Sequence, residues 1–215
     1  MNTPLLLRAW TTLRHEGLRA FWFGSWAVLG YRRLLVLRRP LSTPIPACIP
    51  SLPVAIAWLG LNDVIAYQAL RSEICVEAVT QRLVAGDRCL VAWHEDVIVG
   101  VMWGSTIRAQ SPYLGRDLEL APGEAFQFDG FTSPAARGQG IAPSLSMAWL
   151  RHLREEGHSA AIRLTLPENN AALRAHAKAG YRVIGIVRSL KLGPWRFHAP
   201  FQALSSSDPG VFERL

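Results

Sequence analysis

A glycine-rich turn between a strand-like run and an apolar helix-like run restricts the fold of this chain more than any other feature. Residues 136–142 read ARGQGIA, and they separate EAFQFDGFTS from PSLSMAWLRHLREEG. Glycine has no Cβ, so the backbone of such a turn is accessible. The first N–H groups of a helix lack partners within the helix and favour a bound anion. The segment therefore predicts a phosphate site, although a glycine-rich turn alone is also typical of an ordinary tight turn.

The other hydrophobic patterns arrange strands and helices around this turn. Strand-like runs cover residues 54–60, 88–96, 97–107, 124–133, 159–167 and 181–193, and helix-like runs cover 61–86, 141–156 and 168–180. We expect the helix at 61–86 to be broken in two and the strands around residue 96 to form a hairpin. This order predicts an α/β (α+β) fold with a mixed, mostly antiparallel sheet of six to seven strands flanked by helices.

Positive charge is concentrated at the N-terminus. The chain has a formal charge of +7, and residues 1–40 hold seven arginines against one glutamate, which leaves +1 for the remainder. The same segment contains AFWFGSWAVLGY, which is shorter than the roughly 20 apolar residues that span a bilayer. An amphipathic helix is predicted here, which either covers the domain or lies in a membrane interface. Because residues 39–53 are rich in proline, we divide the chain into an arm at 1–45, a domain at 46–200 and a tail at 201–215.

Composition limits the compartment and the partners. The three cysteines form no CxxC or Cys/His cluster, so neither disulfides nor a metal site is expected. A cytoplasmic location is the default, peripheral to the inner face of the membrane if the arm binds lipid. The nearly neutral body and the two lysines of the whole chain disfavour nucleic acid as a partner. The turn matches neither GxxxxGK[ST] nor GxGxxG, which disfavours nucleoside triphosphates and dinucleotides.

Two sequence blocks resemble the GCN5-related N-acetyltransferase (GNAT) superfamily, and the resemblance covers roughly residues 53–193. The first block is Arg137, Gly138, Gln139, Gly140, Ile141 and Ala142, and the second is Asn169, Ala172, His176, Lys178, Gly180 and Tyr181. The first fits the pyrophosphate-loop pattern Q/R-x-x-G-x-G/A of that superfamily. The resemblance implies acetyl-CoA, or a longer acyl-CoA, as a co-substrate that needs no metal.

The resemblance also implies where the acyl donor binds. The cofactor-binding residues it points to are Phe131, Thr132, Arg137, Gly138, Gln139, Gly140, Ile141, Ala142 and Asn169. Backbone N–H groups of the loop would bind the pyrophosphate. Phe131 and Thr132 would pair with the pantetheine amides as if these formed a short extra strand, and Asn169 would meet the pantetheine arm. The thioester would lie where the strands before and after the loop helix splay apart.

Three side chains are candidate catalytic residues. Attack of an amine on a thioester needs a base, an oxyanion donor and an acid for the leaving thiolate. His176 stands where the superfamily often has a tyrosine acid, and a protonated imidazole would serve. Glu124 and Asp129 are candidate bases, and strand alternation places Asp129 on the same face as Gln127. Each of the three also has a purely structural interpretation.

The leading functional hypothesis is an N-acetyltransferase that acts on a small-molecule amine or an amino sugar. A second hypothesis is transfer of a longer acyl group, from acyl-CoA or an acidic acyl carrier protein, to a peptide amine or a membrane-proximal acceptor. A third, of another class, is a catalytically silent acyl-CoA-binding module. Assembly as a homodimer is left open.

Overall fold

The structure, a computed structural model, describes residues 30–204. Its strands are β1 (Tyr31–Pro40), β2 (Ala55–Trp58), β3 (Arg88–His94), β4 (Val97–Ser105), β5 (Ala109–Ser111), β6 (Arg116–Leu118), β7 (Glu124–Thr132), β8 (Ala160–Thr165), β9 (Arg182–Leu192), β10 (Trp195–His198) and β11 (Gln202–Ala203). Its helices are α2 (Val64–Leu70), α3 (Val76–Val84), α4 (Ile141–Glu155) and α5 (Asn170–Lys178), with 3-10 turns η1 (Leu61–Asp63) and η2 (Pro134–Ala136).

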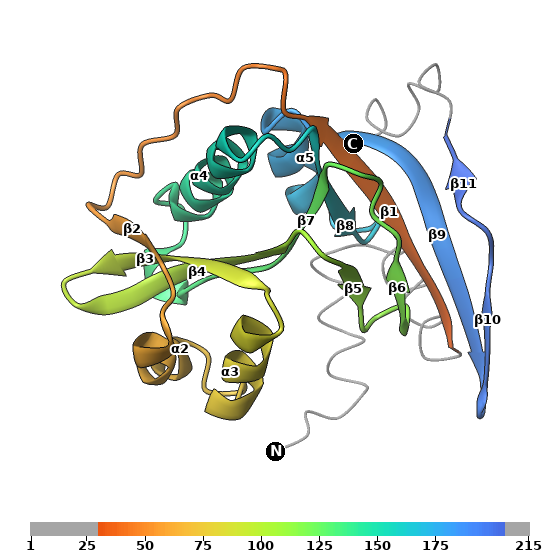
Figure 1. Cartoon of the computed structure of the whole chain (residues 1–215), viewed down its shortest axis with the longest axis horizontal. Helices are drawn as coiled ribbons and strands as arrows, with labels where there is room; N and C mark the ends of the chain where they lie inside the picture. Colours follow the sequence, from red (N-terminus) through yellow and green to blue (C-terminus); the bar gives the residue numbers. More distant parts are fainter. Residues whose placement is uncertain (1–29, 205–215) are drawn as a thin grey trace.

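One large sheet forms the centre of the molecule. Its strand order is β10-β9-β1-β8-β7-β4-β3-β2, and β11 pairs with β9. Helices α4 and α5 lie on one face, while α2, α3 and the small β5–β6 sheet lie on the other (Figure 1). Only β7 and β8 pair in parallel among the described strands. The predicted mixed, mostly antiparallel sheet flanked by helices is therefore confirmed.

The sheet has nine strands rather than six to seven, because β1, β10 and β11 join it. Residues 31–40, which the charge pattern assigned to the arm, form β1 between β8 and β9. The physical reason is the apolar run at residues 34–37, in which all four side chains are buried. Such a run suits a strand covered on both faces. The predicted arm helix falls largely on residues 1–29, outside the described residues, and no helix within 30–204 is long and apolar enough to cross a membrane.

Two features of the sheet position the site. The β7–β8 pairing stops at Phe126 and Ile162, although these strands continue to Thr132 and Thr165. The second feature is the close approach of α4 to β4. A Cβ added at Gly104 would lie 2.3 Å from the Trp149 ring of α4. Glycine is therefore required where this helix crosses the sheet, beside the end of the β7–β8 pairing.

Candidate functional site

The glycine-rich loop connects η2 to the start of α4. Gly138 has φ 76° and Gly140 has φ 80°, in the left-handed region that favours glycine. Gly140 is the N-cap of α4, which begins at Ile141. These two turns direct the chain from the end of β7 into the helix and present the backbone between them.

The N–H groups of residues 138–142 lie at the start of α4 and have no backbone acceptor among the described residues. A Cβ added at Gly138 would meet no atom within 4 Å, so the space beside it is open. Unpaired donors at a helix start form an anion site, to which the helix dipole adds favourable charge. The loop predicted from the sequence therefore has the geometry of such a site.

The proline-rich segment before β2 supports the loop from behind. The Gln139 carbonyl accepts hydrogen bonds from Ser51, at 2.9 Å from its backbone N and 3.3 Å from its Oγ. A Cβ at Gly140 would lie 3.3 Å from Pro50 Cα. These contacts hold the loop in place, and Figure 1 shows the segment running past α4 on its way from β1 to β2.

Four other residues belong to the implied donor site, namely Phe131, Thr132, Arg137 and Asn169. Arg137 donates from Nε to the carbonyl of Thr132 at 3.4 Å, and Thr132 Oγ1 is buried without a partner among the described residues. Asn169 is the N-cap of α5, where its Oδ1 accepts from the Ala172 N–H at 3.0 Å. The Phe131 ring turns to the opposite face of the sheet, with the Arg71 guanidinium 4.6 Å from its centre.

His176 lies on α5 beside a buried arginine, Arg163 of β8. Arg163 Nη1 is 3.0 Å from His176 Nδ1. Burial, assisted by the Arg163 charge, lowers the pKa of His176 to about 3. The imidazole is therefore neutral at pH 7, and because arginine only donates, its proton lies on Nε2. The expectation of a protonated imidazole acid is wrong for this reason.

Asp129 lies on the opposite face of the sheet from Gln127, so the predicted alternation is wrong at this point. The β4–β7 register shifts between Val101 and Trp103, and Asp129 has φ 43°. Such a β-bulge turns the following side chains to the other face. Gln127 contacts Ser146 and Tyr181 on the α4 and α5 side.

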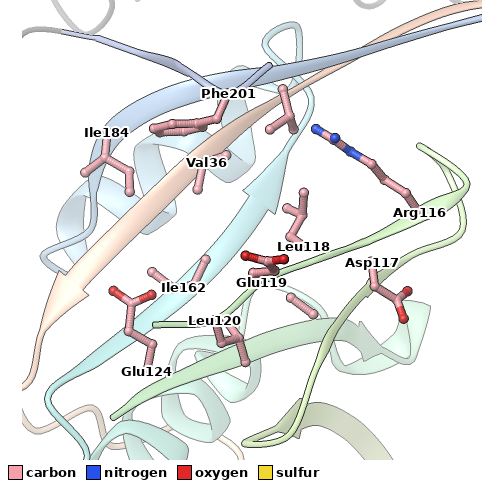
Figure 2. Close-up of a pocket in the computed structure, with 12 residues that line it drawn as sticks. Val36, Arg116, Asp117, Leu118, Glu119, Leu120, Glu124, Ile162, Ile184 and Phe201 are labelled. Atoms are coloured by element: carbon pink, nitrogen blue, oxygen red, sulfur yellow. The ribbon is translucent and has the colours of Figure 1, made fainter. Parts of the chain in front are cut away.

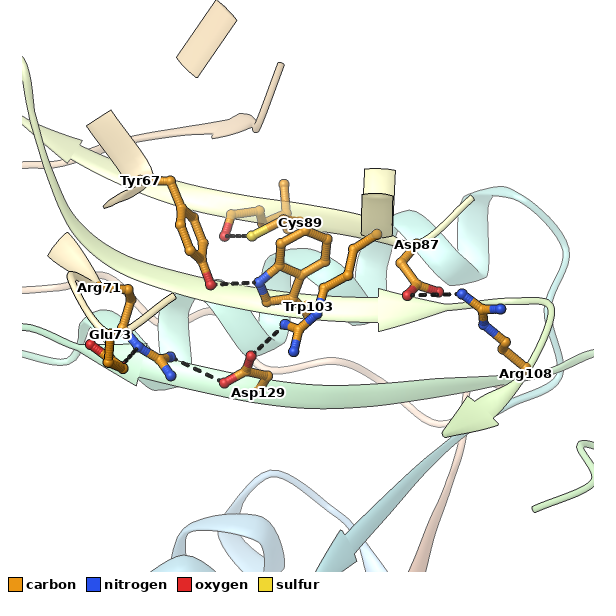
Figure 3. Close-up of polar contacts among 10 residues, drawn as sticks. Tyr67, Arg71, Glu73, Asp87, Cys89, Trp103, Arg108 and Asp129 are labelled. Carbon is orange, nitrogen blue, oxygen red and sulfur yellow. Dashed lines mark hydrogen bonds and ion pairs between the residues drawn. The ribbon is translucent and has the colours of Figure 1, made fainter. Parts of the chain in front are cut away.

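Both carboxylate oxygens of Asp129 are engaged by arginines that the sequence did not single out. One oxygen lies 3.1 Å from Arg71 and the other 2.6 Å from Arg82 (Figure 3). Trp103 on the same face is fully buried and donates to the Tyr67 hydroxyl at 3.0 Å. Burial raises the pKa of Tyr67 to about 12. This face beside the bulge is a packed polar cluster.

Glu124 lies at the other end of β7, away from the loop. Thr132 is the eighth residue after it, which corresponds to roughly 26 Å along a strand. It forms an ion pair with Arg38 at 2.8 Å and lines a cavity of about 420 Å³ (Figure 2). The structure therefore does not bring Glu124 together with the other candidate residues.

The cavity lies on the face of the sheet away from α4 and α5. Apolar side chains from β1, β8 and β9 form its floor, and its charged lining residues are Arg116, Asp117, Glu119 and Glu124 (Figure 2). Ile162, the last β8 residue paired with β7, is part of the floor. Three carboxylates and one guanidinium therefore line the cavity, and one of the carboxylates, Glu124, is already paired with Arg38. The cavity lies next to the part of the sheet where β7 and β8 no longer pair.

Within residues 30–204, no group of three or more His, Cys, Asp or Glu side chains is placed to hold a metal ion. The site is built instead from backbone donors, arginines and aromatic rings.

The fold and the loop together define an α/β protein with an anion site at the start of α4. Beside it, β7 and β8 no longer pair beyond Phe126 and Ile162, and this opening in the sheet is called the seam. The model of the acetyltransferase (GNAT) family matches residues 63–181, more than half of the chain. The chain therefore belongs to the GNAT acetyltransferase family. The matched region includes the loop, Asp129, Arg163 and His176. No curated protein matches the chain.

Solved structures share the fold at low sequence identity. A protein described as a GNAT-family acetyltransferase from Novosphingobium aromaticivorans has 17% identity and a TM-score of 0.52, over 74% of this chain and 65% of that chain. A Drosophila protein has 17% identity and a TM-score of 0.55, over 76% and 52%. Aminoglycoside N-acetyltransferase AAC(6')-Iy, in complex with CoA, has 20% identity and a TM-score of 0.48, over 60% and 91%. This chain thus spans less than two thirds of the first two proteins.

Proposed function

We propose that this protein is an N-acetyltransferase that moves an acetyl group from acetyl-CoA to a primary amine of a small molecule or an amino sugar. The observation that carries the proposal is the row of unpartnered N–H groups at residues 138–142, at the start of α4. A pyrophosphate is a compact anion that suits such a helix start. Membership of the GNAT family makes a coenzyme A thioester the matching substrate.

The residues present fit an acyl-CoA substrate along its length. Gly138, Gly140 and Ala142 would donate to the pyrophosphate, with the Arg137 guanidinium at its edge. The backbone of β7 beyond Phe126 has no β8 partner, so its polar groups are free on that side to bind pantetheine amides. Such pairing would resemble the addition of a short strand to a sheet edge.

The reaction we propose is direct attack by a neutral amine on the thioester carbonyl. We assign Asp129 an anchoring role, because both of its oxygens already hold guanidinium groups of Arg71 and Arg82. The amine proton would pass to water rather than to this carboxylate. We do not assign Glu124 the role of the base, because it lies at the other end of β7 from the loop.

We propose that the cavity with three carboxylates receives the amine acceptor. Its apolar floor would hold the body of a small molecule, and its carboxylates would attract a second ammonium group. Glu119 is exposed and forms no ion pair within the described residues, so its charge is available to a ligand. This arrangement favours diamines and amino sugars over neutral or acidic amines.

Replacing Glu119 with glutamine should therefore weaken the binding of the amine acceptor without weakening the binding of acetyl-CoA. We expect Glu119→Gln to raise the KM for a diamine by about tenfold, equal to 1.4 kcal/mol, and to leave the KM for acetyl-CoA unchanged. Glu77→Gln is the matched control, since Glu77 is exposed on α3 outside the cavity. Equal diamine KM values for both variants would contradict a role of the cavity in acceptor binding.

A turnover assay tests the proposed function. The purified chain is incubated with acetyl-CoA and a set of amines, and both thiol release and acetylated amine are measured. Amine-dependent thiol release with matching acetylated product supports the proposal. Binding of acetyl-CoA without thiol release in the presence of any of the amines would support the silent binding module instead.

A second candidate, transfer of a longer acyl group at a membrane surface, is favoured by one specific observation. Leu192, Trp195 and Phe197 are 52%, 70% and 55% exposed at the β9–β10 hairpin. The Lys191 N–H donates to the carbonyl of Gly30 at 2.9 Å, so the basic, tryptophan-rich residues 1–29 join the domain at this hairpin. Exposed tryptophan beside basic residues is typical of a membrane interface.

Vesicle co-sedimentation tests this second candidate. We expect Trp195→Ser to reduce binding to vesicles that contain an anionic phospholipid by about tenfold. Val84→Ser is the control, because Val84 is 76% exposed on α3, away from the hairpin. Binding that is absent from the wild type, or equal in both variants, would contradict the membrane hypothesis.

A further inference from the structure

Arg163 is a buried cation without a carboxylate partner. The residue is 9% exposed, and no described acidic side chain forms an ion pair with it. Its guanidinium contacts His176 Nδ1 at 3.0 Å and Met102 Sδ at 2.9 Å, and it lies 5.6 Å from the centre of the Tyr181 ring. Its Nε has no hydrogen-bond partner among the described residues. Burying an uncompensated charge is costly, so a protein retains one mainly where the charge has a use.

Arg39 shows how the same protein satisfies a structural arginine. Arg39 is 2% exposed, and it donates to the carbonyls of Ala179, Pro44 and Pro40 at 2.6, 2.9 and 3.2 Å. It therefore links the end of α5 to the end of β1 and the loop that follows β1, through three good acceptors. Arg163 has instead a weakly accepting thioether, an imidazole nitrogen and the Tyr181 hydroxyl, and no carbonyl or carboxylate among the described residues. The guanidinium of Arg163 is thus under-satisfied by comparison.

Arg163 lies at the opening of the sheet. It directly follows Ile162, the last β8 residue paired with β7. Its contact with Met102 of β4 carries the side chain across β7, next to the bulge. A Cβ on Gly130 would lie 3.2 Å from the Met102 sulfur, so β7, β4 and the Arg163 guanidinium all lie near Met102. The proposed function positions the thioester in the seam beside them.

Burial and the contact with Arg163 leave His176, the candidate acid predicted from the sequence, without an acidic proton to give at pH 7. The imidazole accepts from Arg163 and is neutral at pH 7. Tyr181, the other titratable group that faces the guanidinium, donates its hydroxyl to Gln127 Oε1 at 2.8 Å. A leaving thiolate in the seam would meet a fixed positive charge before any acid.

We propose that Arg163 stabilises the leaving thiolate of the acyl donor by its positive charge, in place of a protonating acid. This inference rests on the proposed function. The amine nitrogen forms the C–N bond and shifts the carbonyl electron pair to oxygen. The carbonyl then reforms, the C–S bond breaks, and its electron pair leaves on sulfur as a thiolate paired with the Arg163 guanidinium. The proton lost by the amine passes to water, so the products are the amide, the thiolate and one proton.

The test measures the titration of the CoA thiol bound to the full-length protein, followed by the ultraviolet absorbance of the thiolate. An opposite charge within contact distance should lower the pKa of the bound thiol by about one unit or more relative to free CoA. We expect Arg163→Met to return it to the value of free CoA and Arg163→Lys to retain part of the shift. In turnover, Arg163→Met should lower kcat by about 100-fold and change the KM for acetyl-CoA by less than about threefold.

Arg39→Met is the matched control, because it also removes a buried guanidinium. It should lower the melting temperature by roughly 5 °C or more, because three carbonyls lose their donor, without changing the thiol titration. A bound thiol that titrates like free CoA in the wild type overturns the inference, even if Arg163→Met fails to fold. An equal shift in wild type and Arg163→Met overturns it as well. If the wild type does not bind CoA at all, the proposed function itself fails, and the inference fails with it.

Discussion

Gly138→Val should weaken the binding of acetyl-CoA by about 100-fold or more, a loss of roughly 2.7 kcal/mol. Gly138 has φ 76°, a conformation that a β-branched residue adopts only under strain. A Cβ at this position would enter the open space beside the unpartnered N–H groups. The valine side chain would therefore occupy the volume in which we place the pyrophosphate, and would also disturb the donors that surround it.

Gly157→Val separates these two causes. Gly157 follows α4 with φ 83°, and a Cβ there would also meet no atom within 4 Å. The backbone strain is thus matched, at a position that the proposed donor site does not include. Calorimetric titration with acetyl-CoA should find wild-type affinity in Gly157→Val. A similar loss of affinity in both variants would mean that general strain, rather than the loop, accounts for the effect.

Acidification should destabilise the protein through His176. Its pKa is about 3 in the folded protein, against 6.5 for the ordinary side chain. Between these values the unfolded chain binds the proton and the folded protein does not, so the free energy of unfolding falls as the pH falls. The maximum slope from one such group is about 1.4 kcal/mol per pH unit. This contribution is fully present above about pH 6.5 and is lost progressively toward pH 3.

His176→Gln isolates this contribution, because glutamine retains an acceptor for Arg163 but does not titrate. Urea unfolding of both proteins at several pH values between about 7 and 4 gives the comparison. We expect the wild type to lose stability more steeply than His176→Gln over this range. All other titrating groups are common to the two proteins, so parallel profiles would contradict the assignment of a neutral, buried His176.

The loop and its helix could be predicted from the sequence because their signals are local. Two glycines separated by one residue and followed by an apolar helix pattern specify a turn with an exposed backbone. The break in the helix at 61–86 and the hairpin around residue 96 are also local features, and the structure contains both. The family pattern then identified which anion such a loop suits.

Strand β1 was not predicted because the arginines around its four apolar residues made the segment look like part of a basic arm. Arginine pairs flank the four buried residues 34–37, and a charge count over the first 40 residues gives them most weight. The strand finds its place only through partners far along the chain, in β8 and β9. Such long-range pairing has no local signal. The short strands β5 and β6 were hidden for a similar reason, in a polar stretch rich in turn residues.

The candidate catalytic side chains were the least predictable part of the site. Alternation failed at Asp129 because a bulge depends on the neighbouring strand. That Glu124 lies far from the loop could be seen only from the structure, because it depends on the full length of β7. Arg163 did have a signal, since an arginine interrupts the apolar run SAAIRLTLP. Only the structure reveals that this arginine is buried and lacks a carboxylate.

The central claim is that the loop at residues 138–142 binds the diphosphate of an acyl-CoA. Calorimetric titration of the full-length protein with acetyl-CoA tests it most directly. The account predicts one site per chain with a dissociation constant in the micromolar range, roughly −8 kcal/mol, weakened at least tenfold by Arg137→Glu. The absence of binding at millimolar acetyl-CoA, or wild-type affinity in both Arg137→Glu and Gly138→Val, would contradict the claim.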